Sequence, residues 1–263
     1  MIRIGTSGYS FKDWIGPFYP ENTKPSNMLD FYTGQFKTVE INSTYYRIPH
    51  PKVFEGIAKK IPVDFDVIVK VNRELTHNKD HDVSTMRDIF IAVDGLIRAG
   101  KLKGFLAQFP YSFKYEAENL QHVVNARRAC RGFPLFVEFR HSGWLTDEVY
   151  KIFAASDIGY CNVDEPSLPD LLPPQTLVTN GTGYIRFHGR NTRAWWDPEF
   201  GDRYDYEYSA EELQEWLPLV KKVTESARSD TYLFFNNCHM GQAVKNARMM
   251  RDMLKNQLNL EVV

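Results

Sequence analysis

Charged side chains recur near the carboxyl ends of several short β-type runs in this chain of 263 residues. The chemically active members of this set are Glu40, Lys70, Glu138, Arg140, Asp164, Arg186 and His188. Carboxylates, cations and a histidine in one place supply general acids, general bases and anion-binding groups, and their crowding shifts pKa values. We therefore expect a catalytic pocket. The alternative is a set of ion pairs that only plugs the interior.

The residues of this set are expected to divide by chemistry. Glu40 and Glu138 would act as acid and base, and His188 would assist proton transfer. The three cations would bind anionic groups of a ligand. Lys70 is expected to stay charged in an ion pair, and the alternative is a Schiff-base lysine whose pKa is lowered by burial or nearby arginine.

Metal binding is a further alternative, because carboxylate oxygens and the His188 ring suit Mg²⁺, Mn²⁺ or Zn²⁺. However, the three cations already balance the carboxylates and would repel a dication, and no H-x-H or H-E-x-x-H spacing occurs. The isolated histidines, expected to be polar surface residues, are His77, His81, His141 and His239. We expect neither a metal nor another cofactor.

The loops that follow the strands are rich in aromatic residues, arginine and amides. Such side chains suit stacking on sugars or bases and pairing with phosphate. The expected ligand-binding residues are Ser7, Tyr9, Asn42, Tyr45, Asn72, Gln108, Asn162, Arg190, Trp195, Trp196, Asn236, Asn237 and Gln242. Segment 189–208 is long for a loop after a strand and is a candidate lid. The helix that begins near 240 could hold an anion at its N-terminus.

Eight β-type runs alternate with helical patterns along the chain. The predicted strands are 2–7, 38–42, 66–72, 103–109, 135–140, 159–164, 183–188 and 231–236. The predicted helices are 26–34, 51–60, 84–99, 116–130, 146–155, 209–226 and 240–257. The proline-rich segment 165–180 shows no clear helical period. Ser209 and Glu212 predict a capping box, and Pro218 predicts a kink or break in its helix.

This alternation and length predict one (β/α)8 TIM-type barrel over residues 1–263, with the strand ends building the site. Side chains alternate between the two faces of a strand, so we assign the polar set to the barrel interior. On the sixth strand this places Asn162 and Asp164 inside, with Cys161 and Val163 facing helices. A doubly wound open sheet is the alternative architecture.

Bulk composition excludes several classes of protein. A net charge of −1 gives no general attraction to nucleic acid or to an anionic membrane. The three cysteines, Cys130, Cys161 and Cys238, lack C-x-x-C spacing and are expected to be buried free thiols. We find no signal-peptide core and no apolar run long enough to span a bilayer, so we expect a cytoplasmic protein without a membrane partner.

A set of motifs extends over nearly the whole chain. They are Gly5-Thr6-Ser7-Gly8-Tyr9, Val39-Glu40-Ile41-Asn42-Ser43-Thr44-Tyr45-Tyr46-Arg47, Ala107-Gln108-Phe109-Pro110, Val137-Glu138-Phe139-Arg140-His141, Arg186-Phe187-His188-Gly189-Arg190 and Phe235-Asn236-Asn237. Together they resemble the YecE-like family, which implies a TIM-type barrel of no established activity. The resemblance also implies a comparison with AP-endonuclease-like barrels, and hence an action on nucleic acid.

Three functional hypotheses follow. The leading one is a metal-independent enzyme that acts on a small polar ligand, either phosphorylated or sugar-containing. The second is a nucleic-acid-binding or nucleic-acid-processing protein whose 189–208 segment stacks on bases, although nucleic acid is the less favoured partner. The third is a non-catalytic ligand sensor, which would bind the ligand without turnover.

Overall fold

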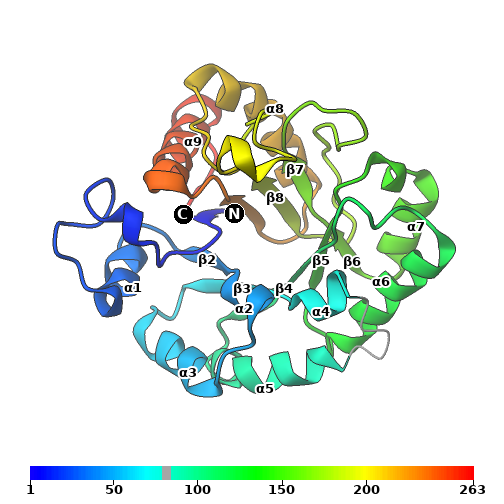
Figure 1. Ribbon diagram of the computed structural model, residues 1–263, viewed down its shortest axis with the longest axis horizontal. Helices are drawn as coiled ribbons and strands as arrows, with labels where there is room; N and C mark the ends of the chain where they lie inside the picture. Colours follow the sequence, from blue (N-terminus) through cyan, green and yellow to red (C-terminus); the bar gives the residue numbers. More distant parts are fainter. Residues whose placement is uncertain (79–83) are drawn as a thin grey trace.

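The computed structural model describes residues 1–78 and 84–263 and forms a ring of parallel strands enclosed by helices (Figure 1). Within these residues the strands are β1 (Ile2–Thr6), β2 (Thr38–Ile41), β3 (Asp66–Lys70), β4 (Leu102–Gln108), β5 (Leu135–Glu138), β6 (Ile158–Tyr160), β7 (Asn162–Asp164), β8 (Gly183–Phe187) and β9 (Thr231–Phe235). The architecture is the predicted (β/α)8 TIM-type barrel.

Seven helices of nine or more residues occur in the described chain, and each lies within two residues of its predicted bounds. They are α1 (Pro25–Thr33), α3 (Pro51–Lys60), α5 (Thr85–Arg98), α6 (Ala117–Ala129), α7 (Asp147–Ala155), α8 (Ala210–Ser226) and α9 (Gln242–Leu258). Short helical turns are α2 (Ser43–Tyr46), α4 (Arg73–Thr76), η1 (Lys12–Trp14), η2 (Ser142–Trp144), η3 (Pro198–Phe200) and η4 (His239–Gly241). Most of these turns lie in loops that follow strands, where a barrel builds its site.

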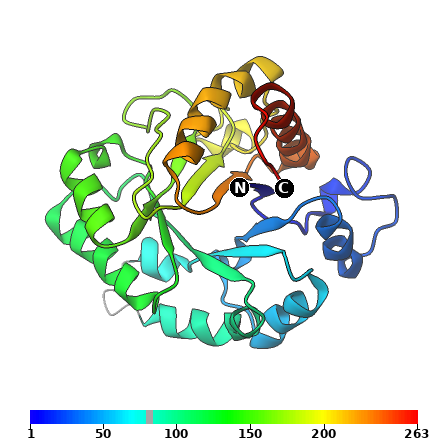
Figure 2. The same ribbon diagram turned by 180° about the vertical axis from the view of Figure 1, so that it is seen from behind.

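Hydrogen bonds join the strands into two arcs of the ring. One arc has the order β1-β9-β8-β7 and the other β2-β3-β4-β5-β6, and the pairs within both arcs are parallel. Helices cover the outside of both arcs, as the view from behind also shows (Figure 2). The strands are therefore buried on both faces, which is why they are apolar over most of their length.

A tyrosine side chain joins the two arcs between β1 and β2. The Tyr32 hydroxyl accepts a hydrogen bond from Thr6 N at 3.0 Å and donates one to Thr38 O at 3.1 Å. Gly5 permits this approach, because a Cβ atom at that position would collide with the Thr38 carbonyl. At this junction a side chain from α1 thus makes the hydrogen bonds that the strand backbones make with each other elsewhere in the ring.

The second junction lies within the predicted sixth strand, which is interrupted at Cys161 and so appears as β6 and β7. The Cys161 amide still donates to Val137 O at 2.9 Å, which keeps the chain in the ring. The predicted facing of this strand is wrong, because Tyr160 pairs with Val137 and Asn162 with Ile185, two residues of the helix-facing layer. Cys161 therefore faces the interior.

The reason for this error is the connection that follows the strand. Segment 165–182 contains no helix, as predicted, and its extended chain lies beside β6 and β7. The Asn162 carboxamide donates to Leu177 O at 2.9 Å and accepts from Leu177 N at 2.8 Å. Asn162 faces outward and is polar because it bonds this irregular backbone. In this strand, polarity therefore did not indicate which residues face the barrel interior.

Other local predictions from the sequence had mixed outcomes. Ser209 and Glu212 form the predicted capping box at the start of α8. Pro218 lies inside α8 without breaking it. Cys130 and Cys161 are buried free thiols as predicted, whereas Cys238 is partly exposed, which corrects the expectation for that residue. No helix of the described chain has the length and apolar character needed to cross a membrane.

Candidate active site at the barrel mouth

Five side chains from four strand ends form an unbroken row of alternating charges inside the barrel, which we call the inner ion-pair chain. Its members, in order, are Glu40, Arg186, Glu138, Arg140 and Glu165. The N···O distances along the chain are 2.7, 2.6, 2.7 and 2.8 Å. Because carboxylates and guanidinium groups alternate along the row, each charge lies beside an opposite one. The row therefore stabilises groups that would each be costly to bury alone.

The centre of the inner ion-pair chain is sealed from water. Glu40 and Glu138 are 0% exposed and Arg186 is 1% exposed. The Tyr184 hydroxyl donates to Glu40 Oε2 at 2.6 Å, and Arg186 Nη2 also donates to Ser7 Oγ at 3.3 Å. Within the described residues, Arg186 Nε has no hydrogen-bond partner, whereas Glu138 Oε1 lies 2.7 Å from Arg140 Nη2 and 3.2 Å from His188 Nε2. Polar atoms left unbonded in a closed interior are costly and often mark functional sites.

Charge pairing fixes the protonation state of this centre. Burial opposes ionisation of Glu138, but Arg140, Arg186 and His188 outweigh burial and hold the pKa of its carboxyl well below the usual range. Burial likewise opposes the charge of Arg186, and Glu138 with Glu40 raises its pKa well above normal. Glu138 is therefore a permanent carboxylate that binds two guanidinium groups, which corrects its expected role as a titrating acid or base.

His188 lies beside this centre as a neutral imidazole. Its Nε2 is 3.2 Å from Glu138 Oε1 and 3.1 Å from Arg140 Nη2, and its Nδ1 is 3.0 Å from Asn236 Nδ2. Burial first, and then Arg140, lowers the pKa of His188 to about 3. The ring therefore remains uncharged near pH 7.

Glu165 ends the chain with a different environment. Its Oε2 accepts from Arg140 and its Oε1 accepts from Leu172 N at 3.0 Å. Burial outweighs both partners and raises the pKa of Glu165 to about 7. The carboxyl can therefore change charge near neutral pH without leaving its site. Glu165 was not predicted, because it is one residue beyond the expected sixth strand.

Lys70 is the one cation of the predicted set that the structure leaves outside the ion pairs. Its Nζ donates to Gln108 Oε1 at 2.9 Å and lies 4.4 Å from the centre of the Tyr45 ring. Among the described residues no carboxylate oxygen is recorded within 4 Å of Nζ, so the expected ion pair of Lys70 is wrong. Burial, followed by Arg186, lowers the pKa of Lys70 to about 7.

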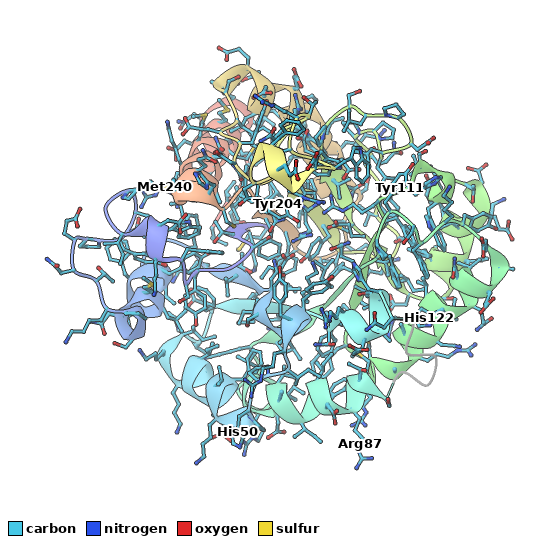
Figure 3. All side chains as sticks on the ribbon, viewed as in Figure 1. His50, Arg87, Tyr111, His122, Tyr204 and Met240 are labelled. Atoms are coloured by element: carbon cyan, nitrogen blue, oxygen red, sulfur yellow. The ribbon has the colours of Figure 1, made fainter. Side chains whose placement is uncertain are left out.

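A cavity of about 420 Å³ lies at the mouth of the barrel beside these groups, and we call it the mouth cavity. Its basic lining residues are Lys70, His77, Arg140 and Arg203, and its aromatic ones are Tyr45, Tyr46, Tyr111, Trp195, Trp196 and Tyr204. No carboxylate is among the described residues that line it. Figure 3 shows Tyr204 toward the middle of the ring and Tyr111 nearer its edge.

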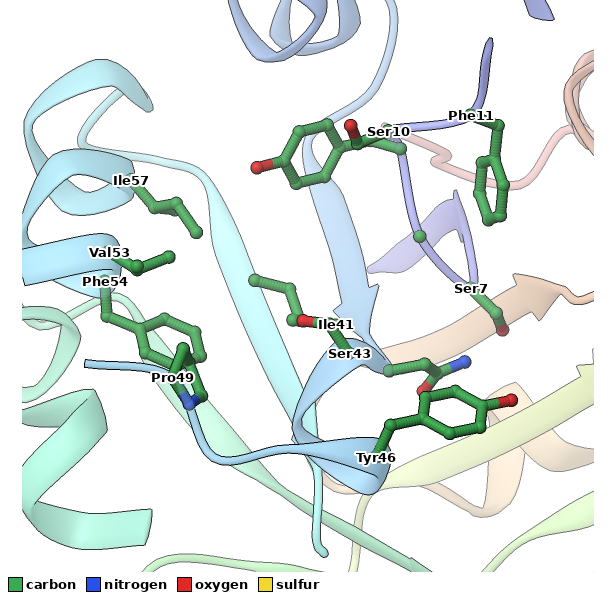
Figure 4. Close-up of a pocket in the computed structure, with 13 residues that line it drawn as sticks. Ser7, Ser10, Phe11, Ile41, Ser43, Tyr46, Pro49, Val53, Phe54 and Ile57 are labelled. Atoms are coloured by element: carbon green, nitrogen blue, oxygen red, sulfur yellow. The ribbon is translucent and has the colours of Figure 1, made fainter. Parts of the chain in front are cut away.

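A second cavity of about 340 Å³, the side cavity, lies between the loop after β1 and helix α3 (Figure 4). Ser7, Ser10 and Phe11 face it from the loop, and Val53 and Ile57 face it from the helix. Tyr9 and Asn42 also line it, and the buried Asn42 Oδ1 has no hydrogen-bond partner in the described chain. Tyr46 borders both cavities. The side cavity is mainly apolar, so it differs from the mouth cavity in the ligand group it would accept.

The sequence matches the family model "Protein of unknown function DUF72" over residues 3–261. The chain belongs to the DUF72 family. The UPF0759 protein YunF of Bacillus subtilis (strain 168) is 27% identical over 271 residues, which cover 97% of this chain and 95% of YunF. The resemblance to the YecE-like family is confirmed, since that is another name for the same family.

Solved structures of DUF72 proteins share this fold. A DUF72 family protein from Thermotoga maritima is 39% identical with a TM-score of 0.89, and the match covers 97% of this chain and 100% of that chain. A DUF72 family protein from Enterococcus faecalis is 25% identical with a TM-score of 0.83, covering 99% and 96% of the two chains. These matches support the barrel and the family, and their names state no activity.

This DUF72 barrel brings together most of the predicted residues. Those in or beside the inner ion-pair chain are Ser7, Glu40, Lys70, Gln108, Glu138, Arg140, Arg186, His188 and Asn236. Those that line the mouth cavity above it include Tyr45, Trp195 and Trp196. The Arg140 guanidinium carbon lies 5.4 Å from the centre of the Trp195 ring, so the aromatic wall directly contacts the chain of charges.

Asp164 and Arg190 lie elsewhere, which corrects their expected place in the pocket. Asp164 is bonded to Arg190, to the Tyr208 hydroxyl at 2.5 Å and to Trp216 Nε1 of α8 at 2.5 Å. It faces the helices, because Val163 occupies the inner position of β7 opposite Arg186. These bonds hold the start and end of segment 189–208, so Asp164 positions that segment.

Other predicted ligand residues are bonded to the chain itself. Asn72 accepts from Glu74 N and donates to Thr44 O, which holds α4. Asn162 bonds Leu177 outside the barrel, as described above. Asn237 donates to Tyr206 O and Asn246 Oδ1. Gln242 accepts from Tyr206 N and donates to Asp205 Oδ1, so its side chain is engaged at the expected anion site of α9.

No three His, Cys, Asp or Glu side chains of the described residues are grouped as a metal site would require. His77 lines the mouth cavity instead of the free surface expected for it, and burial followed by Lys70 lowers its pKa to about 4. His141 accepts from Gly143 N, and His239 lies 3.7 Å from Asp205. His81 lies outside the described residues.

Sequence reasoning missed Tyr184 and Arg203 as well as Glu165. Tyr184 could have been found, because it lies two residues before Arg186 on the same face of β8. Arg203 and Tyr204 belong to the long segment 189–208, in which no periodicity indicates which side chains turn inward. Only the fold of that segment brings them to the mouth cavity.

Proposed function

We propose that this protein is an enzyme that acts on a small anionic molecule, phosphorylated or sugar-containing, bound in the mouth cavity. One observation carries the proposal: two arginines, a lysine, a neutral histidine and six aromatic rings line the cavity, with no carboxylate among its described lining residues. Guanidinium groups bind phosphate in paired hydrogen bonds, and flat rings stack on sugar faces and bases. A cavity of about 420 Å³ suits a small ligand.

The inner ion-pair chain lies next to this ligand site and fixes the position of one of its lining residues. Arg140 is both a member of the chain and a lining residue of the cavity, so the chain holds one of its guanidinium groups in place. Glu40 and Glu138 are sealed and bonded to arginine, and they act through that positioning. Lys70 lines the cavity and, with a pKa of about 7, can exchange a proton near neutral pH. Glu165 has a similar pKa but lies behind Arg140 and does not line the cavity.

The proposed reaction does not use a metal. The carboxylates that would bind a cation are each already bonded to a guanidinium group, and the cavity wall beside them is basic. Elemental mass spectrometry of untagged protein, and turnover of a panel of phosphorylated sugars with and without a chelator, test this. A stoichiometric metal, or turnover that is lost in chelator, would contradict the metal-independent reading.

Ligand binding itself is tested with phenyl phosphate, which carries an aromatic ring and a phosphate. Arg203 lines the cavity and lies 5.6 Å from the Trp195 ring, so Arg203→Met is expected to weaken binding about tenfold, or roughly 1.4 kcal/mol. Arg193→Met is the matched control, because Arg193 lies over Phe200 in the same segment and does not line the cavity. Isothermal titration calorimetry measures both. Equal affinities of the two variants, or no binding by the parent protein, would overturn the site.

A second candidate is binding of single-stranded nucleic acid at the rim. Its support is Trp196, which is 51% exposed and contacts the Tyr111 ring at 4.9 Å, close to Arg203 on the cavity wall. Stacking on such a ring with basic neighbours is typical of single-strand binding. Oligonucleotide affinity that falls steeply with salt would favour this function. Binding of phenyl phosphate without any turnover of the panel would favour the ligand-sensor alternative.

A further inference from the structure

We propose that Lys70 is a nucleophile that condenses with an aldehyde or ketone group of the ligand in the mouth cavity. The inference rests on the proposed function and narrows its ligand to an anionic carbonyl compound. A lysine serves this chemistry when it is desolvated, lies near other cations and faces the bound ligand. The structure places Lys70 in such a position.

The first argument is the separation of Lys70 from the carboxylates around it. Arg186 holds both Glu40 and Glu138, at 2.7 and 2.6 Å, so the nearest acids are bonded to a guanidinium group. Lys70 is left with a neutral acceptor, Gln108 Oε1, at 2.9 Å. Lys70 is partly buried, and a lysine kept there for its charge alone would be expected to pair with an acid, because an unpaired ammonium withdrawn from water is costly.

The second argument is the fixed orientation of the amine. Gln108 Nε2 donates to Phe109 O at 2.9 Å, which turns Gln108 Oε1 toward Lys70. The Tyr45 ring lies 4.4 Å from Nζ on another side. Lys70, Gln108 and Tyr45 all line the mouth cavity, so the amine is held at the wall of that cavity.

Burial favours the neutral form of Lys70, and the surrounding charges act in both directions. Burial is the largest cause of its lowered pKa of about 7, Arg186 and Arg140 add to it, and Glu138 and Glu40 oppose it. His77, on the loop after α4, is neutral at this pH because its own pKa is about 4. A substantial share of the Lys70 amines is therefore unprotonated at pH 7, whereas an exposed lysine is almost fully protonated.

The condensation balances without a further reactant. The Nζ lone pair attacks the carbonyl carbon, a C–N bond forms, and the C=O π pair moves to oxygen. One proton passes from nitrogen to that oxygen to give a carbinolamine. The C–O bond then breaks, water leaves with a second proton of the amine, and the nitrogen lone pair completes the C=N bond. The anionic part of the ligand would meanwhile bind Arg140 and Arg203 across the cavity.

Reductive trapping tests the proposal. The protein is incubated at pH 7 with pyridoxal 5′-phosphate, an aromatic aldehyde that carries a phosphate, and cyanoborohydride as the hydride donor. We expect peptide mass spectrometry to find the reduced adduct on Lys70 at least tenfold faster than on any exposed lysine. The trapping rate at Lys70 should rise with pH and reach half its maximum near pH 7, because the neutral amine reacts.

Variants separate this result from general lysine modification. Lys70→Arg and Lys70→Met should both remove the fast adduct, with circular dichroism showing that each is folded. Lys103→Arg, which replaces a strand lysine at the opposite end of the barrel, should leave it unchanged. Adducts that form on exposed lysines as fast as on Lys70, or a half-maximum above about pH 9, would overturn the proposal.

Failure of the inference differs from failure of the proposed function. If the protein binds phenyl phosphate but Lys70 is not trapped, the anionic ligand site stands and the nucleophile is wrong. If neither probe binds, the ligand site itself is wrong and the inference fails with it.

Discussion

The two ends of the barrel each contain a buried carboxylate that binds arginine, yet they differ in how completely the charges are satisfied. At the N-terminal end of the strands, Arg3 Nε lies 2.8 Å from both Asp66 and Asp230, and Tyr232 donates to Asp66 at 2.8 Å. Water reaches this group, since the side chains of Arg3 and Asp230 are 17% and 32% exposed. At the C-terminal end, the centre of the inner ion-pair chain is closed to water.

The difference favours the C-terminal end of the barrel as the place of the proposed function. The N-terminal group tethers strand starts and leaves no cation of its own without a carboxylate, because Lys103 also lies 3.7 Å from Asp66. The C-terminal group holds Lys70 apart from the acids, leaves Arg186 Nε without a hydrogen bond in the described chain, and borders the mouth cavity. Such a costly arrangement is typical of a functional site, and barrels use this end for their sites.

The largest effect is expected from Glu138→Gln, which removes the charge shared by Arg186 and Arg140. Breaking a buried pair typically costs about 3 to 5 kcal/mol, because the partner charge remains buried. We expect a loss of that size in the free energy of unfolding from urea titration, together with loss of phenyl phosphate binding. A destabilisation under about 1 kcal/mol would mean that the two guanidinium groups do not depend on Glu138.

An intermediate effect is expected from the pH dependence of His188→Gln. The folded pKa of His188 is about 3 against an ordinary 6.5, so between these values the unfolded chain binds more protons. The parent protein therefore loses stability as pH falls from 7 to 4, and the variant lacks this loss. The free energy of unfolding of the parent protein should therefore fall by about 3 kcal/mol relative to that of the variant over that range.

Urea titrations at several pH values measure this difference, with His239→Gln as the surface control. Glu165 is present in all three proteins, so its opposite contribution cancels. The contribution of Glu165 has the opposite sign to that of His188. A carboxyl with a folded pKa near 7 stabilises the protein at low pH, and this stabilisation is lost as pH rises. A difference that stays constant with pH would show that His188 is not buried as a neutral ring.

The smallest effect is expected at the other end of the barrel, from Asp66→Asn. Burial outweighs Tyr232 and Arg3 and raises the pKa of Asp66, so its charge contributes little net stability. We expect a loss of about 1 kcal/mol and unchanged phenyl phosphate affinity, since the amide can still accept from Tyr232 and Arg3. A loss as large as that of Glu138→Gln would remove the contrast between the two ends.

Local patterns predicted the bounds of the helices. They also predicted, for seven of the eight strands, which side chains face the barrel interior. The sixth strand did not, because Asn162 and Asp164 are polar for a different reason: they bond an irregular connection and helix α8. Polarity alone does not separate a side chain that faces a ligand cavity from one that satisfies nearby backbone. Glu165 was missed for a related reason, since its position depends on the fold of segment 165–172.

By itself the sequence determined the barrel, its helices and the set of polar residues at the strand ends, because these depend on periodicity and on contacts between near neighbours along the chain. Only the tertiary structure decided which charges meet. Arg186 pairs with Glu40 across 146 positions of sequence, and that pair is what leaves Lys70 with an amide as its partner. Distances and burial set the charge of each group, and neither is a property of the linear sequence.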